Sequence, residues 1–264
     1  CALVGACGNE LGGPVGAFVA TIFACEFGKL VSKETKIDII VTPFVTICVG
    51  VLLSLGCAPA IGAAASTVGT AIMWATELQP FFMGIIVSVI VGIALTLPIS
   101  SAAICAALSL TGLAGGAAVA GCCAQMVGFA VMSFKENKWG GLFAQGIGTS
   151  MLQMGNIVRN PRIWLPPTLA SAITGPVATC IFHLKMNGAA VASGMGTCGL
   201  VGQIGVYTGW VNDIAEGTKA AITGMDWAGL VLICFILPAV LSWAIAIPMR
   251  KCGWIKENDL KLDL

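Results

Sequence analysis

The sequence has few charged residues, and this shortage sets the class of protein. Only 9% of its 264 residues are Asp, Glu, Lys or Arg, whereas 58% are hydrophobic. Soluble domains carry roughly 25% charged residues, so this chain cannot cover itself with a soluble surface, and most of it must face lipid. The net charge of +1 also gives no sign of the basic surface that binds nucleic acid.

Histidine is nearly absent, and the cysteines are not arranged as metal ligands. His183 is the single histidine, and no two of the 12 cysteines are spaced as C-x-x-C, so no zinc constellation is visible. Most cysteines lie within apolar runs, where the side chain packs as a small hydrophobe. We therefore expect neither a metal site nor a cofactor.

Long apolar runs are what the sequence has in abundance. Several approach the ~20 residues needed to cross a hydrocarbon core of ~30 Å. They are Gly12–Gly28, Ile39–Gly56, Cys57–Thr76, Gln79–Leu97, Ala114–Phe134, Trp164–Phe182 and Trp227–Met249. We predict an all-α polytopic membrane protein, a single transport domain over 1–264 with seven to eight spans. Because the chain starts at Cys1 within membrane-grade sequence, we also expect further N-terminal spans.

Two further segments are apolar enough for a membrane but rich in Gly, Ser or Pro, at Leu97–Leu113 and Met186–Val206. Non-helical backbone at membrane depth is tolerated only where protein or a water-filled cavity shields it. Pairs of such segments are typical of transporters that bind their substrate near the midplane. We therefore predict two re-entrant hairpins around a substrate pathway.

Lysine and arginine set the predicted orientation, because cytoplasmic loops carry an excess of both. They gather in Lys29–Asp38, in Lys135–Arg162 and after Met249, whereas the polar segment Tyr207–Asp226 has three acidic residues and one lysine. We expect the 250–264 tail in the cytoplasm and the 207–226 loop outside.

The first candidate site lies in the Leu97–Leu113 segment. Pro98 disrupts a helix and frees backbone carbonyls, and the hydroxyls of Ser100 and Ser101 can donate and accept hydrogen bonds to a polyhydroxy ligand or to those carbonyls. A helix kink patched by serine is the equal alternative.

The second candidate site is the polar stretch GIGTSMLQMGNIVRNPRIWLPP, 146–167. Thr149, Ser150, Gln153 and Asn156 have the spacing of one helical face, and Asn160 precedes a proline that should end the helix. Uncharged hydroxyls and amides suit a sugar in a mostly apolar cavity. Gln203 adds one more amide, in the second predicted hairpin.

Three ionisable side chains border the predicted spans. Glu10, Glu77 and His183 each lie near the end of a run. A place in the headgroup region explains each of them, and the alternative is a polar group on the permeation pathway.

In this order and spacing the segments resemble those of the enzyme IIC membrane subunit of bacterial phosphotransferase-system sugar transporters. The resemblance is carried by KIDIIVTPFVTICVGVLLSLGCAPAIGAAAS, LQPFFMGIIVSVIVGIALTLPISSAAICAAL, the 146–167 stretch and GMGTCGLVGQIGVYTGW. It is strongest to the stand-alone IIC-like family that includes perfringolysin-regulator-type proteins. The resemblance implies a homodimer, a sugar or polyol substrate, and separate IIA and IIB phosphocarrier proteins.

The chain departs from fructose- and glucose-type relatives at one position of interest. Their segment similar to 146–161 carries a Gly-Ile-Thr-Glu type motif, and the resemblance implies that a glutamate there orients the sugar hydroxyl. Gly146, Ile147, Asn160 and Pro161 are kept here, but the stretch contains no glutamate. A carboxylate can accept a hydroxyl proton, so its absence leaves two alternatives open, a non-phosphorylating sensor or regulator and a facilitator for another small solute.

Overall fold

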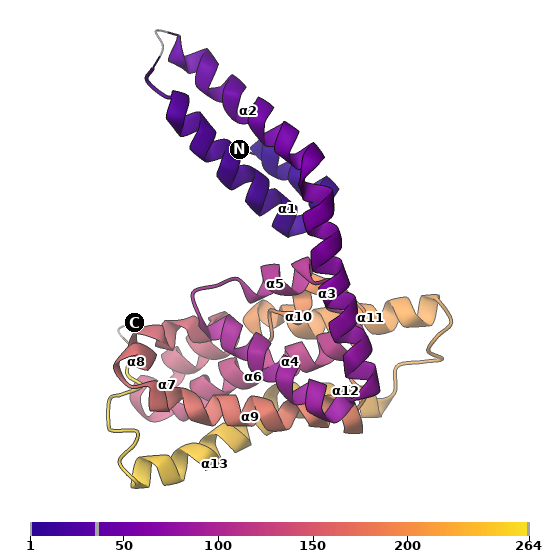
Figure 1. The fold of residues 1–264 in the computed structure, drawn as a ribbon. Helices are drawn as coiled ribbons and strands as arrows, with labels where there is room; N and C mark the ends of the chain where they lie inside the picture. The colour runs from indigo at the N-terminus through magenta and orange to yellow at the C-terminus, as the bar shows by residue number, and fades with distance from the viewer. Residues whose placement is uncertain (1, 35–36, 263–264) are drawn as a thin grey trace. The chain divides into compact units, whose positions relative to one another are not determined.

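The computed structural model describes residues 2–34 and 37–262, and these are helical with no strand among them. One isolated β-bridge joins Gly112 and Met186. The prediction of an all-α chain is therefore confirmed. The chain divides into two compact units, Cys1–Thr70 and Ala71–Leu264, and the helices are labelled in Figure 1.

The first unit contains α1 (Ala2–Val31), α2 (Asp38–Gly56) and the beginning of α3 (Ala58–Leu78). α1 is broken at Gly12 and Gly13, and Gly13 has φ +63°, a conformation that suits glycine. A Cβ at Gly8 would lie 2.8 Å from Ala17 Cα, so the two halves of α1 fold back and pack against each other. The predicted span from Gly12 is thus the second half of a helical hairpin.

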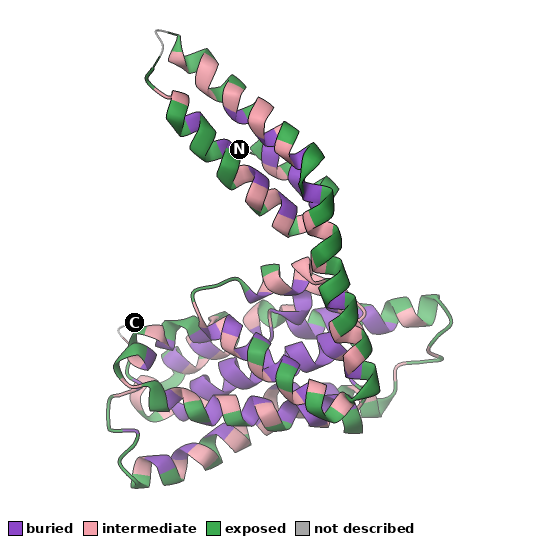
Figure 2. Cartoon of the chain, viewed as in Figure 1, coloured by how far each residue is buried: buried purple, intermediate pink, exposed green. Residues whose placement is uncertain are grey.

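The second unit is built around α6 (Gly112–Met132). Its most apolar 18-residue window is 94% buried in the protein, and Figure 2 shows it almost wholly buried. α4 (Pro80–Thr96), α9 (Leu165–Pro176) and α13 (Leu237–Lys251) pack around it. The small residues of α6 permit this, because glycine and alanine let neighbouring backbones approach closely.

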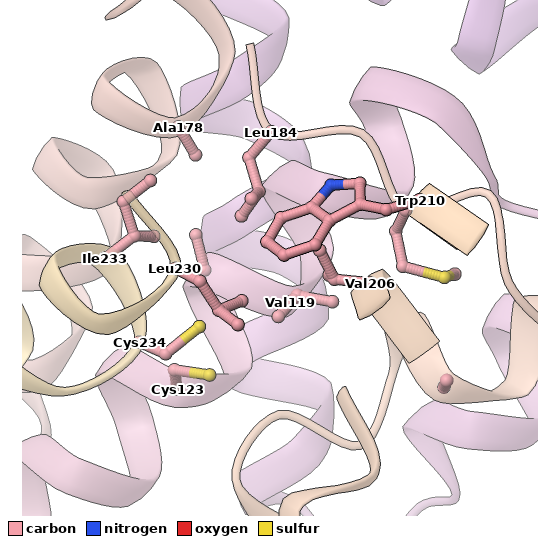
Figure 3. Close-up of a cluster of buried hydrophobic side chains, with 12 residues drawn as sticks. Val119, Cys123, Ala178, Leu184, Val206, Trp210, Leu230, Ile233 and Cys234 are labelled. Atoms are coloured by element: carbon pink, nitrogen blue, oxygen red, sulfur yellow. The ribbon is translucent and has the colours of Figure 1, made fainter. Parts of the chain in front are cut away.

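The remaining helices of this unit are short. They are α5 (Ser101–Ala107), α7 (Phe134–Phe143), α8 (Met154–Arg159), α10 (Ala190–Ser193), α11 (Val201–Ala215) and α12 (Gly224–Val231). Shorter 3-10 or π turns join them: η1 (Ala144–Gly148), η2 (Ser150–Gln153), η3 (Pro161–Trp164), η4 (Val177–Ile181), η5 (Cys198–Leu200) and η6 (Leu232–Ile236). A buried cluster around Trp210, Val119 and Ile233 ties α11, α6 and η6 together (Figure 3).

Within the part of the chain that the structure describes, five helices are long and apolar enough to cross a membrane by length and composition. They are Ala2–Val31, Asp38–Gly56, Ala58–Leu78, Gly112–Met132 and Gly224–Lys251. α4 is a shorter apolar helix of 17 residues. Phe82 and Ile90 on α4 are 62% and 61% exposed, as expected for side chains that face lipid. The sequence predicts seven to eight spans, and the spans in addition to these five remain a prediction.

The two segments predicted as hairpins pack against each other. Ser101 donates a hydrogen bond of 2.7 Å to the Gly194 carbonyl, and Ser193 donates one of 3.1 Å to the Leu110 carbonyl. The Gly112–Met186 bridge joins the same two segments. Whether they re-enter a membrane stays a prediction, but these contacts place the two predicted hairpin segments side by side in the second unit.

The predicted 207–226 loop is wrong in its first half, because α11 runs through it to Ala215. Gly202, Val206, Gly209 and Trp210 are buried at helical spacing, so this helix presents an apolar face to the core. Polar residues that lie between these buried positions obscure the helical period in the sequence. The loop proper is confined to 216–223.

Candidate functional site

The polar stretch folds into short helical turns that end where the sequence predicts. Thr149 precedes η2, and its hydroxyl accepts a hydrogen bond from Met151 N at 3.2 Å. α8 then ends at Arg159, and Asn160 adopts an extended conformation before Pro161. The helix ends there because the residue before a proline is driven out of the α region.

Five side-chain amides from this stretch and its neighbours gather beside the C-terminal segment 254–262, and we call them the amide cluster: Asn137, Gln145, Gln153, Asn156 and Asn160. Gln153 Nε2 donates to Gln145 Oε1 at 2.9 Å, and Asn156 Nδ2 donates to Gln153 Oε1 at 2.8 Å. Gln145 and Gln153 are fully buried. Because a buried amide is costly unless it is hydrogen-bonded, the cluster fixes these side chains in mutual orientation.

A second polar network lies beside the cluster, centred on Gln125 in the middle of α6. Its Oε1 accepts from Trp164 Nε1 at 3.1 Å and from Thr96 Oγ1 at 3.3 Å. Its Nε2 donates to Thr168 Oγ1 at 3.2 Å. Thr96 Oγ1 also lies 3.0 Å from Ser150 Oγ, so this network joins the polar stretch to the end of α4, two residues before Pro98.

The C-terminal segment Trp254–Leu262, here called the tail strap, lies against the amide cluster. Gln153 Nε2 and Asn137 Nδ2 donate to the Leu260 carbonyl at 3.0 and 2.7 Å. Asn156 Nδ2 donates to the Lys261 carbonyl at 2.9 Å, and Asn160 Nδ2 donates to Asp259 Oδ2 at 2.7 Å. Asp259 thus places a carboxylate beside the Asn160–Pro161 step, from outside the stretch itself.

Two ion pairs border the strap. Arg250 Nη1 lies 2.7 Å from Glu136 Oε1, and the Glu136 side chain is only 5% exposed. Lys135 Nζ lies 2.9 Å from Glu257 Oε1 at an exposed position. The hydrogen bond from Lys135 holds the pKa of the Glu257 carboxyl below its usual value.

The predicted residues of the first candidate site have different surroundings. Ser101 is buried between the two hairpin segments, whereas Pro98 and Ser100 are exposed. The Ser100 hydroxyl accepts from Ala103 N at 3.1 Å and so caps α5. Ser100 therefore caps a helix and Ser101 joins the two segments, and the binding of a ligand by either hydroxyl stays a prediction.

Gln203 lies on the face of α11 that packs against α6. Its Nε2 is 3.3 Å from Cys123 Sγ, and its side chain is 8% exposed. Its Oε1 is buried and has no hydrogen-bond partner within the described part of the chain. A buried amide oxygen left unpaired is an acceptor available to a hydroxyl or ammonium donor.

The three ionisable candidates lie apart from the amide cluster. Glu10 belongs to the first unit and is exposed, and Glu77 is exposed near the end of α3. His183, also exposed, lines a pocket of about 360 Å³ together with Lys185, Asp213 and Lys219. The structure joins none of the three to the described polar networks.

Sequence reasoning missed Gln145, Gln125, Thr96, Asn137 and Asp259, which complete these networks. Gln125 stands inside the apolar run GCCAQMVGF, and a lone amide within a membrane-grade helix is a usable signal. The others had none, because their partners are distant in sequence. Among the described residues, no group of His, Cys, Asp or Glu could hold a metal ion.

Three segments far apart in sequence therefore meet in one region. η1 of the polar stretch contacts η5 of the second hairpin segment, η2 contacts α4, and α5 contacts both α4 and α10. A family model described as "Phosphotransferase system, EIIC" matches residues 3–262.

The chain belongs to the phosphotransferase-system EIIC family. An EIIC subunit is the membrane part of a sugar-transport system, and the apolar helices agree with a multi-pass protein of the cytoplasmic membrane. The predicted family and the membrane location are thereby confirmed. Comparison with curated proteins and comparison with solved structures each give no match.

Proposed function

We propose that this EIIC subunit binds a sugar or related polyol among the uncharged polar groups of the second unit and translocates it inward. The observation that carries the proposal is the meeting of the two hairpin segments with the polar stretch, in which Ser150 and Gln153 are buried and belong to hydrogen-bonded networks. Amides and hydroxyls are the groups that orient a polyhydroxy ligand in an otherwise apolar site.

Gln203 supplies the most specific support. Most of the polar groups already have protein partners, whereas its Oε1 is buried and has no partner among residues 2–34 and 37–262. A buried acceptor without a partner is costly, and a substrate hydroxyl would relieve that cost. Ser150, Thr149, Asn156 and Asn160 complete the proposed binding set, with Ser101 and Pro98 shaping the first hairpin segment.

We propose that phosphorylation of the sugar would use separate IIA and IIB phosphocarrier proteins, with which membership of the EIIC family is consistent. We also propose a homodimer with a cytoplasmic C-terminus, of the stand-alone IIC-like type.

Uptake by reconstituted protein tests the function. Liposomes containing the full chain would be assayed with labelled glucose, fructose and mannitol, with and without a phosphorylated IIB protein inside. We expect uptake of at least one sugar. Gln203→Met should lower that uptake about 10-fold, as expected from the loss of roughly 1.4 kcal/mol.

Gln79→Met is the matched control, because Gln79 is exposed and lies at the opposite end of α4 from Thr96. Its uptake should equal that of the wild type. No uptake or binding of any sugar by the wild-type protein would refute the proposal, and equal uptake by both variants would remove Gln203 from the site.

A sensor that binds a sugar without phosphorylating it is the second candidate. It is supported by the lack of glutamate in the 146–161 stretch, where the carboxylate that bonds to Asn160 comes instead from Asp259. The two functions differ in the same assay, because a sensor would bind sugar and give no sugar phosphate with IIB present. A facilitator would take up its solute at the same rate with and without the IIB protein.

A further inference from the structure

The tail strap occupies donors that a polyol would also use. The amides of Gln153, Asn156 and Asn137 donate to backbone carbonyls of Leu260 and Lys261, at 2.7 to 3.0 Å. Asn160 donates to the Trp254 carbonyl at 2.9 Å and to Asp259 Oδ2 at 2.7 Å. Carbonyl and hydroxyl oxygens are equivalent acceptors for an amide N–H, so strap and ligand cannot use the same donors together.

The strap is attached in a way that suits release as a unit. Gly253, with φ +72°, links it to the end of α13, and it contains neither a helix nor a strand. Two side chains anchor it in the core, Ile255 at 2% and Leu260 at 0% exposure. Lys256, Glu257 and Asn258 between them are exposed, so the buried apolar contacts of the segment are concentrated at these two side chains. Segments with few buried contacts open without unfolding of the whole domain.

The anchors and the hydrogen bonds are coupled. Leu260 places its side chain in the cluster of Phe129, Ile157 and Ile163 and its carbonyl on two amides at once. Withdrawal of this one residue therefore frees Gln153 and Asn137 together. Asn156 and Asn160 lose their partners as the rest of the strap follows.

We infer that Trp254–Leu262 is a tethered competitor, which satisfies the amide cluster when no substrate is bound and must leave before a polyol can bind there. The inference rests on the proposed sugar-binding function and adds its regulation. A protein with the strap docked presents a closed amide cluster, and whatever displaces the strap increases substrate affinity. The apparent affinity equals the intrinsic affinity multiplied by the fraction of molecules in which the strap is undocked.

Hydrogen exchange of the full chain in nanodiscs tests whether the strap opens. We expect the Lys256 and Leu262 amides, which donate to Asp259 Oδ2 and Asn137 Oδ1, to exchange roughly 100-fold faster than those of α6 through local opening. Exchange of the strap as slow as that of α6 would overturn the inference, because the strap would then be a fixed part of the fold.

The second measurement uses Leu260→Ser, which weakens an anchor and leaves every amide donor in place. Leu169→Ser is the matched control, because Leu169 is 48% exposed on α9. Binding of labelled glucose, fructose and mannitol would be measured for both variants and the wild type. We expect Leu260→Ser to speed exchange of the strap and to lower the Kd of the bound sugar about 10-fold, with no change for the control.

The outcomes separate the two proposals. Equal sugar affinity of Leu260→Ser and wild type would overturn the competitor role and leave the sugar-binding function standing. Binding of no sugar by any of the three proteins would overturn both. If Leu260→Ser unfolds, Asp259→Ala serves in its place, since it removes the acceptor of Asn160 and of Lys256 N and touches no core residue.

Discussion

Gln125 shows how one buried amide organises its surroundings. It stands fully buried near the middle of α6 and bonds to residues of α4, η3 and α9. Each of those partners is itself buried or half-buried. Loss of the amide would remove the acceptor of the Trp164 indole N–H, whereas Thr96 and Thr168 would each keep another hydrogen-bond partner.

We therefore expect Gln125→Leu to destabilise the protein by about 1–3 kcal/mol, the cost of leaving buried donors and acceptors unsatisfied. Thermal unfolding in detergent, followed by size-exclusion chromatography, would measure the change. Gln79→Leu is the control at an exposed site. An unchanged melting temperature for Gln125→Leu would mean that the network adds nothing to stability.

At the scale of elements, α4 and α6 approach each other through glycine. A Cβ added at Gly121 on α6 would clash with the Ser88 backbone on α4, and one at Gly92 would lie 2.8 Å from the Gly121 carbonyl oxygen. Membrane helices gain packing energy from such close approach. The crossing point therefore fixes α4, and with it Thr96 and the first hairpin segment.

Gly121→Ala should separate the two helices and cost about 1–3 kcal/mol, as overpacking in a close-packed core does. It should also lower sugar uptake, because Thr96 would shift relative to Ser150. Gly155→Ala in α8 is the matched substitution, since nothing lies within 4 Å of its Cβ position. If both variants melt at the same temperature, the close crossing has no energetic role.

The end of α13 is held to α7 by an ion pair. Arg250 donates to both carboxylate oxygens of Glu136 and to the Met132 carbonyl. Glu136→Gln should cost about 2 kcal/mol, in the range of hydrogen bonds to charged groups. Lys135→Gln should leave the melting temperature unchanged, because the Lys135–Glu257 pair is exposed and such pairs contribute little. Equal effects of the two substitutions would contradict this ranking.

At the scale of the whole molecule, orientation in the membrane follows from lysine and arginine. Their excess at 135–162 and in the 250–264 tail favours a cytoplasmic location for these segments. An alkaline phosphatase fused after Leu264 should be inactive, and one inserted at Gly217 in the 216–223 loop should be active. The reverse pattern of phosphatase activity would show that the topology is the opposite one, with the tail strap outside the cell.

The sequence by itself determined the class of protein, the family and the long apolar helices. The scarcity of charge and the long apolar runs are properties of whole segments, so they predict membrane helices whatever the tertiary packing. The helix end at Asn160–Pro161 follows from local sterics. These features need no knowledge of what lies across the fold. The Val201–Ala215 helix was missed because its buried face is carried by glycines as much as by bulky residues.

Only the tertiary structure decided which polar groups meet. The Ser150 hydroxyl lies beside that of Thr96, and the Gln153 amide donates to Gln145. Asp259 from the tail places a carboxylate beside Asn160, in a stretch that has no glutamate of its own. These partners are separated by 8 to 99 residues along the chain, and no periodicity links them. Hydrogen bonds of this kind depend on where helices cross, and the crossings depend on close packing of the whole unit.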